Sequence, residues 1–132
     1  CEEDPAEQDD TSATAVNIGF GLQLQRNICG LGDADWFKFP SGDLEHYMLI
    51  ARSIGAGSAV KVSVYAADGI TLLGSATAGG MNMSTSLGVM VPKNETVYIK
   101  VEPAFANLTG TAVLYSMNVV PGYRISLPLI LK

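Results

Sequence analysis

The sequence has few positive charges, and those it has are scattered. Its 132 residues include 8 Lys and Arg against 13 Asp and Glu, which gives a formal net charge of −5 at pH 7. Proteins that bind nucleic acids carry clustered basic residues, because they must neutralise a run of phosphates. We therefore expect no nucleic-acid partner.

Long apolar runs and catalytic motifs are also missing. No apolar stretch approaches the roughly 18 residues that a membrane-spanning helix needs, so no transmembrane segment is expected. His46 is the only histidine, and no nucleophile elbow, zinc-protease motif or phosphate-binding loop occurs in the sequence. A lone histidine is more often structural than catalytic. We predict that the chain is not an enzyme.

Cysteine is scarce too, with only Cys1 and Cys29 in the chain. The low lysine content and the many Gly, Ser, Thr and Asn residues favour an exported protein, in which two cysteines commonly pair. A Cys1–Cys29 disulfide would close a loop of about 28 residues and stabilise the fold by roughly 3–4 kcal/mol. The alternative is that Cys1 is a lipid-modified N-terminus, as in bacterial lipoproteins, which would leave Cys29 alone.

The sequence is rich in segments whose apolar residues recur at every second position. Clear examples are residues 60–65, 97–102 and 113–119, and residues 22–28, 33–39 and 46–52 are similar. This period is typical of strands with one face on a core and one in water. Turn signals separate the segments, including Asp68-Gly69, Gly79-Gly80 and the stretch from Pro92 to Glu95. The pattern predicts an all-β fold, an antiparallel, jelly-roll-like β-sandwich of roughly eight strands.

The stretch "GDADWFKF" places two aspartates beside the only tryptophan. In an extended strand, Asp33 and Asp35 point to one side and Trp36 to the other. We predict that Trp36 faces the core and that both aspartates face outward at the rim of the sheet. Outward carboxylates need a partner, and two interpretations stay open. The aspartates cap turns through backbone N–H groups, or they bind Ca²⁺ together with Glu7, Asp9 and Asp10 of the acidic N-terminal arm.

The C-terminal segment, "PGYRISLPLILK", has a different character. It is apolar and β-prone, but Pro128 cannot donate to a sheet ladder, so the segment suits an edge strand or an extended tail. We divide the chain into a sandwich with its acidic arm, residues 1–120, and a tail, residues 121–132. Either the tail completes its own sandwich, or it self-associates by pairing with a neighbouring molecule.

The order of these motifs resembles the bacterial pre-peptidase C-terminal domain family. "EQDDTSATAVNIGFGLQLQRNICGLGDADWFKF" is similar to the family's opening, and the matching positions include Glu7, Asp9, Asp10, Thr11, Ala15, Ile18, Gly21, Ile28, Gly32, Asp33, Asp35, Trp36 and Phe37. "VKVSVYAADGITLLG", "ETVYIKVEP" and "GTAVLYSMNVV" resemble its later strands, so the likeness runs over residues 7–120. Gln8 and Asp9 depart from the usual proline and asparagine.

The resemblance implies a sandwich similar to the collagen-binding domains of clostridial collagenases, and a non-catalytic module attached to exported proteins. It also implies structural calcium, since some members bind this ion with acids from the two segments that hold Glu7, Asp9, Asp10, Asp33 and Asp35. We expect a secreted or cell-surface bacterial accessory module that binds an extracellular protein or polysaccharide, or assists export of a partner. The alternative is a structural subunit of a filament or surface assembly, joined by strand donation.

Overall fold

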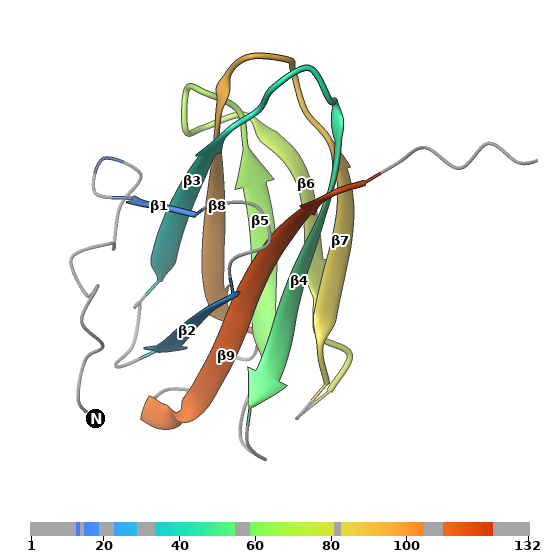
Figure 1. Ribbon diagram of the computed structural model, residues 1–132. Coiled ribbons are helices and arrows are strands. Elements are labelled where there is room, and N and C mark those ends of the chain that lie inside the picture. The colour runs from blue at the N-terminus through green and yellow to red at the C-terminus, as the bar shows by residue number, and fades with distance from the viewer. Residues whose placement is uncertain are drawn as a thin grey trace, which may run out of the picture.

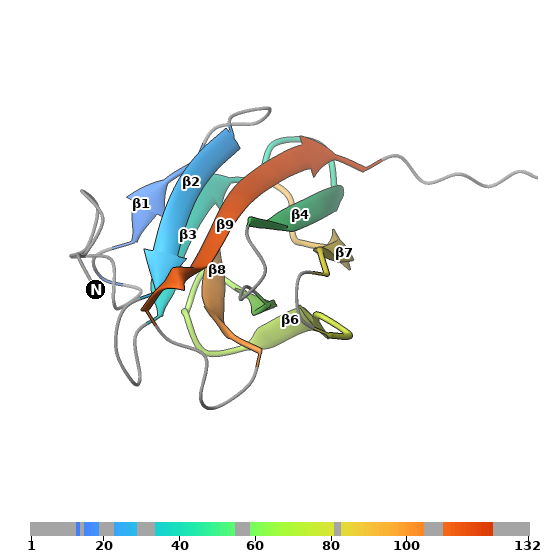
Figure 2. The same ribbon diagram turned by 90° about the horizontal axis from the view of Figure 1, so that it is seen from below.

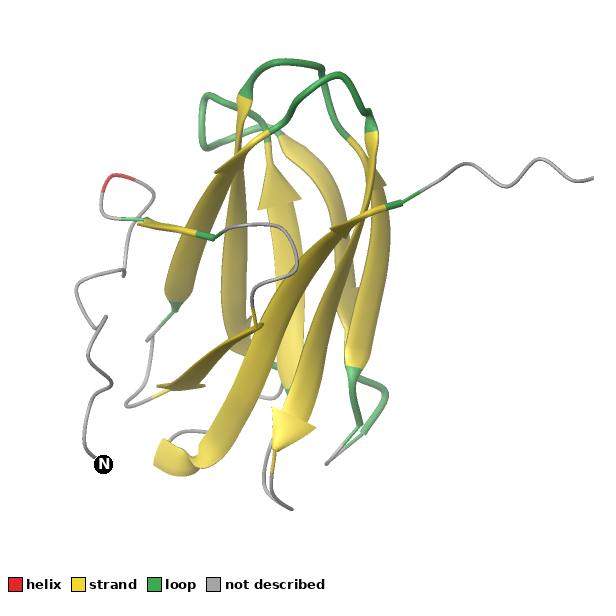
Figure 3. Cartoon of the chain, viewed as in Figure 1, coloured by secondary structure: helices red, strands yellow, loops and turns green. Residues whose placement is uncertain are grey.

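The computed structural model describes residues 13, 15–18, 23–28, 34–54, 59–80, 83–104 and 110–122, with backbone only for 23–28, 54 and 110–114. Strands make up most of this part of the chain, and loops and turns make up nearly all of the rest (Figure 3). Its strands are β1 Val16–Asn17, β2 Gln23–Ile28, β3 Asp35–Pro40, β4 His46–Ile54, β5 Val60–Tyr65, β6 Leu72–Thr77, β7 Thr85–Met90, β8 Thr96–Pro103 and β9 Gly110–Pro121. The predicted all-β class is confirmed.

The strands form two facing sheets (Figures 1 and 2), with the orders β1-β3-β8-β5-β6 and β2-β9-β4-β7. The antiparallel pairs are nested: β5 pairs with β6, β4 with β7, β3 with β8, and β2 with β9. One long hairpin wound in this way gives the jelly roll, in which two antiparallel sheets cover each other's apolar faces. The predicted β-sandwich is therefore confirmed. The two-residue β1 runs parallel to β3 at the edge of its sheet.

The core lies between the sheets and follows the predicted alternation. On β5, Val60, Val62 and Val64 are at most 1% exposed, and Val97, Ile99 and Val101 on β8 are fully buried. The facing sheet contributes Leu49, Ala51, Tyr115, Met117 and Val119. Burial of these side chains is the main stabilising term, at about 25 cal/mol per Å² of apolar surface removed from water.

Loops at one end of the sandwich hold the two sheets in register. Ser41, in the β3–β4 loop, is buried, and its hydroxyl lies 2.5 Å from the Pro92 carbonyl and accepts the Glu95 N–H at 2.9 Å. The β7–β8 turn also holds Asn94 at φ 56°, a left-handed conformation that asparagine tolerates better than most residues. Figure 1 shows these two loops side by side.

The predicted Asp68-Gly69 turn joins β5 to β6. The Gly69 N–H donates to the Ala66 carbonyl at 2.9 Å, and Gly69 has φ 70°. Both Asp68 carboxylate oxygens are used: Oδ1 accepts the N–H groups of Ile70 and Thr71, and Oδ2 accepts the Thr71 hydroxyl. These bonds lower the pKa of the exposed Asp68 carboxyl to about 2. The bond from the Thr71 hydroxyl has the largest effect.

Candidate functional site

The carboxylate of Asp35 lies inside the sandwich, not at its outer rim. Asp35 begins β3 and is fully buried, and its Oδ2 accepts a hydrogen bond from the hydroxyl of Tyr115 on β9. This bond joins the two sheets across the core. The prediction that Asp35 faces outward is therefore wrong. A hydrogen bond of this kind offsets the cost of burying a polar carboxyl group.

Trp36 lies on the outer face of its sheet, which is the opposite side from the one predicted. Phe37 and Phe39 are fully buried with Asp35, whereas Trp36 and Lys38 alternate with them and are half-buried. The prediction that Trp36 is a core residue is wrong. The physical reason is Lys38, which lies on the same side of β3 as Trp36. A strand that turned Trp36 inward would also bury the Lys38 ammonium group in the core.

Trp36 instead belongs to an aromatic patch on the outer face of the five-stranded sheet. We define this patch by Trp36, Tyr65 and Tyr98 together with Lys38, Lys61 and Lys100. Opposed residues of antiparallel strands share a face, and Trp36 pairs with Lys100 while Tyr98 pairs with both Lys38 and Tyr65. All six side chains are half-buried, so each still presents part of its surface to solvent.

The rings in this patch contact each other across the intervening strand β8. The Trp36 and Tyr65 ring centroids are 5.4 Å apart with an angle of 33° between the ring planes. The Lys100 ammonium lies 5.9 Å from the centroid of the Trp36 ring and 3.7 Å from a Glu102 carboxylate oxygen. The tilted ring contact and the cation–π contact hold the indole against the sheet. The patch is a preformed, amphipathic surface with three positive charges on a chain whose net charge is −5.

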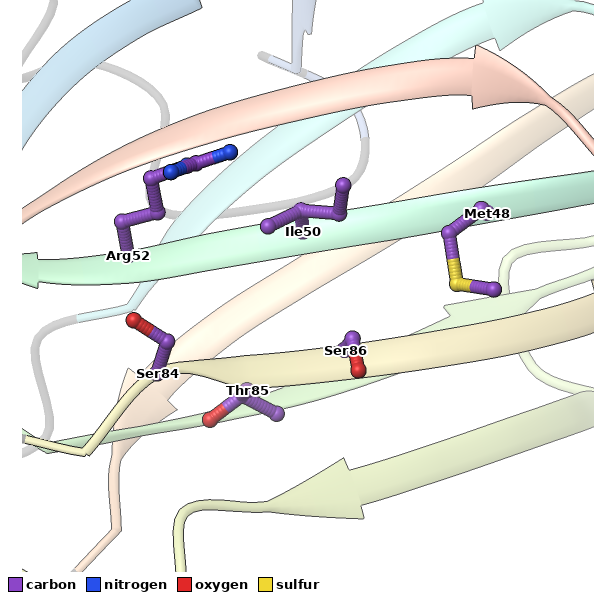
Figure 4. A pocket seen from close by; sticks show the side chains of 6 residues that line it. All are labelled: Met48, Ile50, Arg52, Ser84, Thr85 and Ser86. Atoms are coloured by element: carbon purple, nitrogen blue, oxygen red, sulfur yellow. The ribbon is translucent and has the colours of Figure 1, made fainter.

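The outer face of the other sheet carries two shallow hollows between β4 and β7. The first, of about 420 Å³, is lined by Met48, Ile50, Arg52, Ser84, Thr85 and Ser86 (Figure 4). The second, of about 290 Å³, is lined by His46, Met48 and Met90 among others. Met48 and Met90 are 36% and 56% exposed.

Most of the predicted metal and disulfide residues lie outside the described part of the chain. These are Cys1, Glu7, Asp9, Asp10, Cys29 and Asp33. Within the described residues, no three His, Cys, Asp or Glu side chains are grouped so as to hold a metal ion. No helix in the described ranges is long and apolar enough to cross a membrane.

Two features of the structure were not predicted from the sequence. The aromatic patch depends on residues from β3, β5 and β8, which only the sheet order brings together. The bond between Tyr115 and Asp35 spans 80 positions of the sequence. One local signal was present: Lys38, two residues after Trp36, marks their shared side of β3 as the solvent side.

No family model and no curated protein sequence matches the chain. Solved structures do match. The pre-peptidase C-terminal domain of a collagenase from Bacillus anthracis aligns with a TM-score of 0.60 at 14% identity, over 80% of this chain and 93% of that one. The chain has the fold of a pre-peptidase C-terminal domain. The resemblance drawn from the sequence motifs is thus confirmed at the level of the fold.

Two further structures are similar. CorA, a surface-associated copper-binding protein of Methylomicrobium album BG8, aligns with a TM-score of 0.65 at 7% identity, over 82% of this chain and 98% of that one. PliG, a periplasmic inhibitor of g-type lysozyme from Aeromonas hydrophila, gives a TM-score of 0.47 at 12% identity over 80% and 91%. At these identities, the alignment with CorA shows a shared fold and nothing about shared ligands.

Proposed function

We propose that this chain is a non-catalytic accessory module of an exported or cell-surface protein, and that it binds an extracellular protein through the aromatic patch. The observation that carries the proposal is the ring contact between Trp36 and Tyr65 on an outer sheet face, beside Tyr98 and three lysines. Tryptophan and tyrosine are enriched where proteins bind proteins, because they provide large contact areas and lose little conformational entropy.

The charge of the patch favours a partner with an acidic surface. Lys38, Lys61 and Lys100 flank the rings, and the one acid among the residues paired with them is Glu102 opposite Lys61. Complementary charge raises the association rate and selects the partner. The fold supports an accessory role, since the similar domain from Bacillus anthracis is the C-terminal domain of a collagenase. The surface-associated CorA, which shares the fold, supports the exported location that we propose.

The sole tryptophan makes the proposal directly testable, because Trp36 reports binding at the patch and nowhere else. Native collagen and gelatin are suitable protein probes, and alginate is a suitable acidic polysaccharide. We expect a protein probe to change the emission of Trp36, and Lys61→Glu to weaken that binding about tenfold, which corresponds to about 1.4 kcal/mol. The matched control is Arg52→Glu, which reverses an exposed charge on the other sheet.

Three outcomes separate the interpretations of this experiment. Binding of a protein probe that depends on Lys61 but not on Arg52 supports the proposal. Binding of alginate alone would make the partner a polysaccharide. Binding of a probe without any change in Trp36 emission, or equal loss in both charge-reversal variants, contradicts a role for the patch.

A structural-subunit function joined by strand donation is the second candidate. Among the described residues, β7 pairs with β4 alone, so one side of β7 is a sheet edge. β9 stays paired with β4 as far as Pro121, and the Gly122 N–H donates to the His46 carbonyl at 2.8 Å. A test should therefore delete residues 123–132 and keep Pro121 and Gly122. Conversion of a folded oligomer to a folded monomer, measured by size exclusion, would support strand donation. An unchanged oligomeric state would contradict it.

Structural calcium remains a proposal and now rests on Glu7, Asp9, Asp10 and Asp33. The inward position of Asp35 and its bond to Tyr115 do not fit the outward ligand set that the family resemblance implies. Calcium would bind at least six oxygens. The remaining acids would therefore need backbone carbonyls or water to complete the shell.

A further inference from the structure

Three side chains with soft or borderline donor atoms lie together on the outer face of the four-stranded sheet. His46 and Met48 are on β4, and Met90 on β7 is directly opposite His46 in the antiparallel register. All three line the same hollow of about 290 Å³, with Gly88 and Gly122 beside them. His46 is half-buried, and both methionines are exposed.

The strand register places the His46, Met48 and Met90 side chains close enough for all three to contact a single bound ion. Directly opposed residues have Cβ atoms about 4.5–5.5 Å apart, and residues two positions apart on one strand are about 7 Å apart. Met48 leans across Gly88 toward β7, because its terminal methyl carbon is 3.8 Å from the position that a Cβ of Gly88 would occupy. Figure 4 shows the Met48 thioether directed from β4 toward β7. A larger residue than Gly88 would crowd this path.

The donor chemistry selects a soft ion. Thioether sulfur and neutral imidazole bind Cu(I), whereas Ca²⁺ and Mg²⁺ require oxygen ligands. None of the described residues that line the hollow is an Asp or Glu. A thioether loses no proton on binding, so the site needs only a neutral imidazole. Methionine is also flexible enough to move its sulfur into a coordinating position without backbone motion.

We propose that His46, Met48 and Met90 bind one Cu(I) ion. This inference does not rest on the proposed function, since the aromatic patch lies on the other sheet. It accounts for two methionines at positions where leucine would give the same apolar surface without the risk of oxidation to the sulfoxide.

The test is a titration of the full chain with Ag(I), a redox-inert substitute for Cu(I), followed by Cu(I) itself under anaerobic conditions. Any thiols are first alkylated, so that Cys1 and Cys29 do not compete. Methyl-labelled methionine provides the readout by NMR. Of the five methionines, we expect Met48 and Met90 to shift with one equivalent of metal. Met83, exposed in the loop before β7, and Met117, buried in the core, serve as internal controls.

Leucine substitutions separate coordination from apolar contact. Met48→Leu and Met90→Leu keep the volume and apolar character but remove the sulfur, and each should weaken Ag(I) binding about tenfold or more. Met83→Leu should leave it unchanged, and His46→Gln should weaken it. Unshifted Met48 and Met90 methyls in the wild-type protein, or full affinity in the Met48→Leu/Met90→Leu double variant, would overturn the proposal. Neither result would affect collagen or gelatin binding at Trp36.

Discussion

The hydroxyl of Tyr115 provides the sharpest test of how this sandwich is held together. It donates to Asp35 from the opposite sheet, and both residues are fully buried. Tyr115→Phe removes the oxygen and leaves the ring in place, so the apolar packing changes little. The Asp35 carboxylate then loses a donor in a site that water does not reach.

The expected loss follows from the chemistry of this bond. Removing the donor from a buried acceptor costs about 1–3 kcal/mol, and we expect Tyr115→Phe to cost about 2 kcal/mol. The unfolding entropy is about 2.1 cal/mol/K per residue, or about 0.28 kcal/mol/K for 132 residues. The melting temperature should therefore fall by about 7 °C.

The assay is urea unfolding together with thermal melting, with Tyr47→Phe as the matched control. The Tyr47 hydroxyl accepts the Gly42 N–H at 3.1 Å, which is a neutral bond near the rim, so its removal should cost about 1 kcal/mol. In an Asp35→Asn background, Tyr115→Phe should cost less than in the wild-type protein, because the carboxyl acceptor is gone. A cost below about 0.5 kcal/mol in the wild-type background, with an unchanged urea slope, would refute the reasoning.

Three further predictions concern the turn and the arm. Asp68 has a folded-state pKa of about 2 against an ordinary value of 3.8, so its stabilising effect is present above about pH 4 and is lost as the pH falls toward 2. Asp68→Asn should be less stable at pH 7 and should lose less stability across that window, as measured by urea unfolding at each pH. Calcium should raise the melting temperature relative to chelator by several degrees, as expected for a ligand of the folded state; identical curves would remove the calcium site. Thiol titration of the denatured, unreduced protein should find no free thiol if Cys1 and Cys29 are paired, and two free thiols would exclude the disulfide.

The strands and their inward faces could be predicted wherever one face is plainly apolar. Val60, Val62 and Val64 alternate with polar or larger residues, and the structure buries all three. The same holds for Val97, Ile99 and Val101. In such segments, a shift of the strand register by one residue would turn every buried apolar side chain to the solvent. The local pattern therefore decides which face of the strand is buried.

The strand β3 was harder to predict because both of its faces carry apolar residues. The sequence by itself determined that residues 35–40 are extended, since aromatic residues and a period of two favour a strand. Lys38 was the one sign in the sequence of which face is inside, and the sequence did not show what would accompany Asp35 in the core. Only the tertiary structure supplies Tyr115, from a strand 80 positions away, as a partner for the buried Asp35. Trp36 faces outward for three reasons: the bond between Asp35 and Tyr115, the burial of Phe37 and Phe39, and the cost of burying Lys38. On the outer face, residues of β5 and β8 complete the aromatic patch.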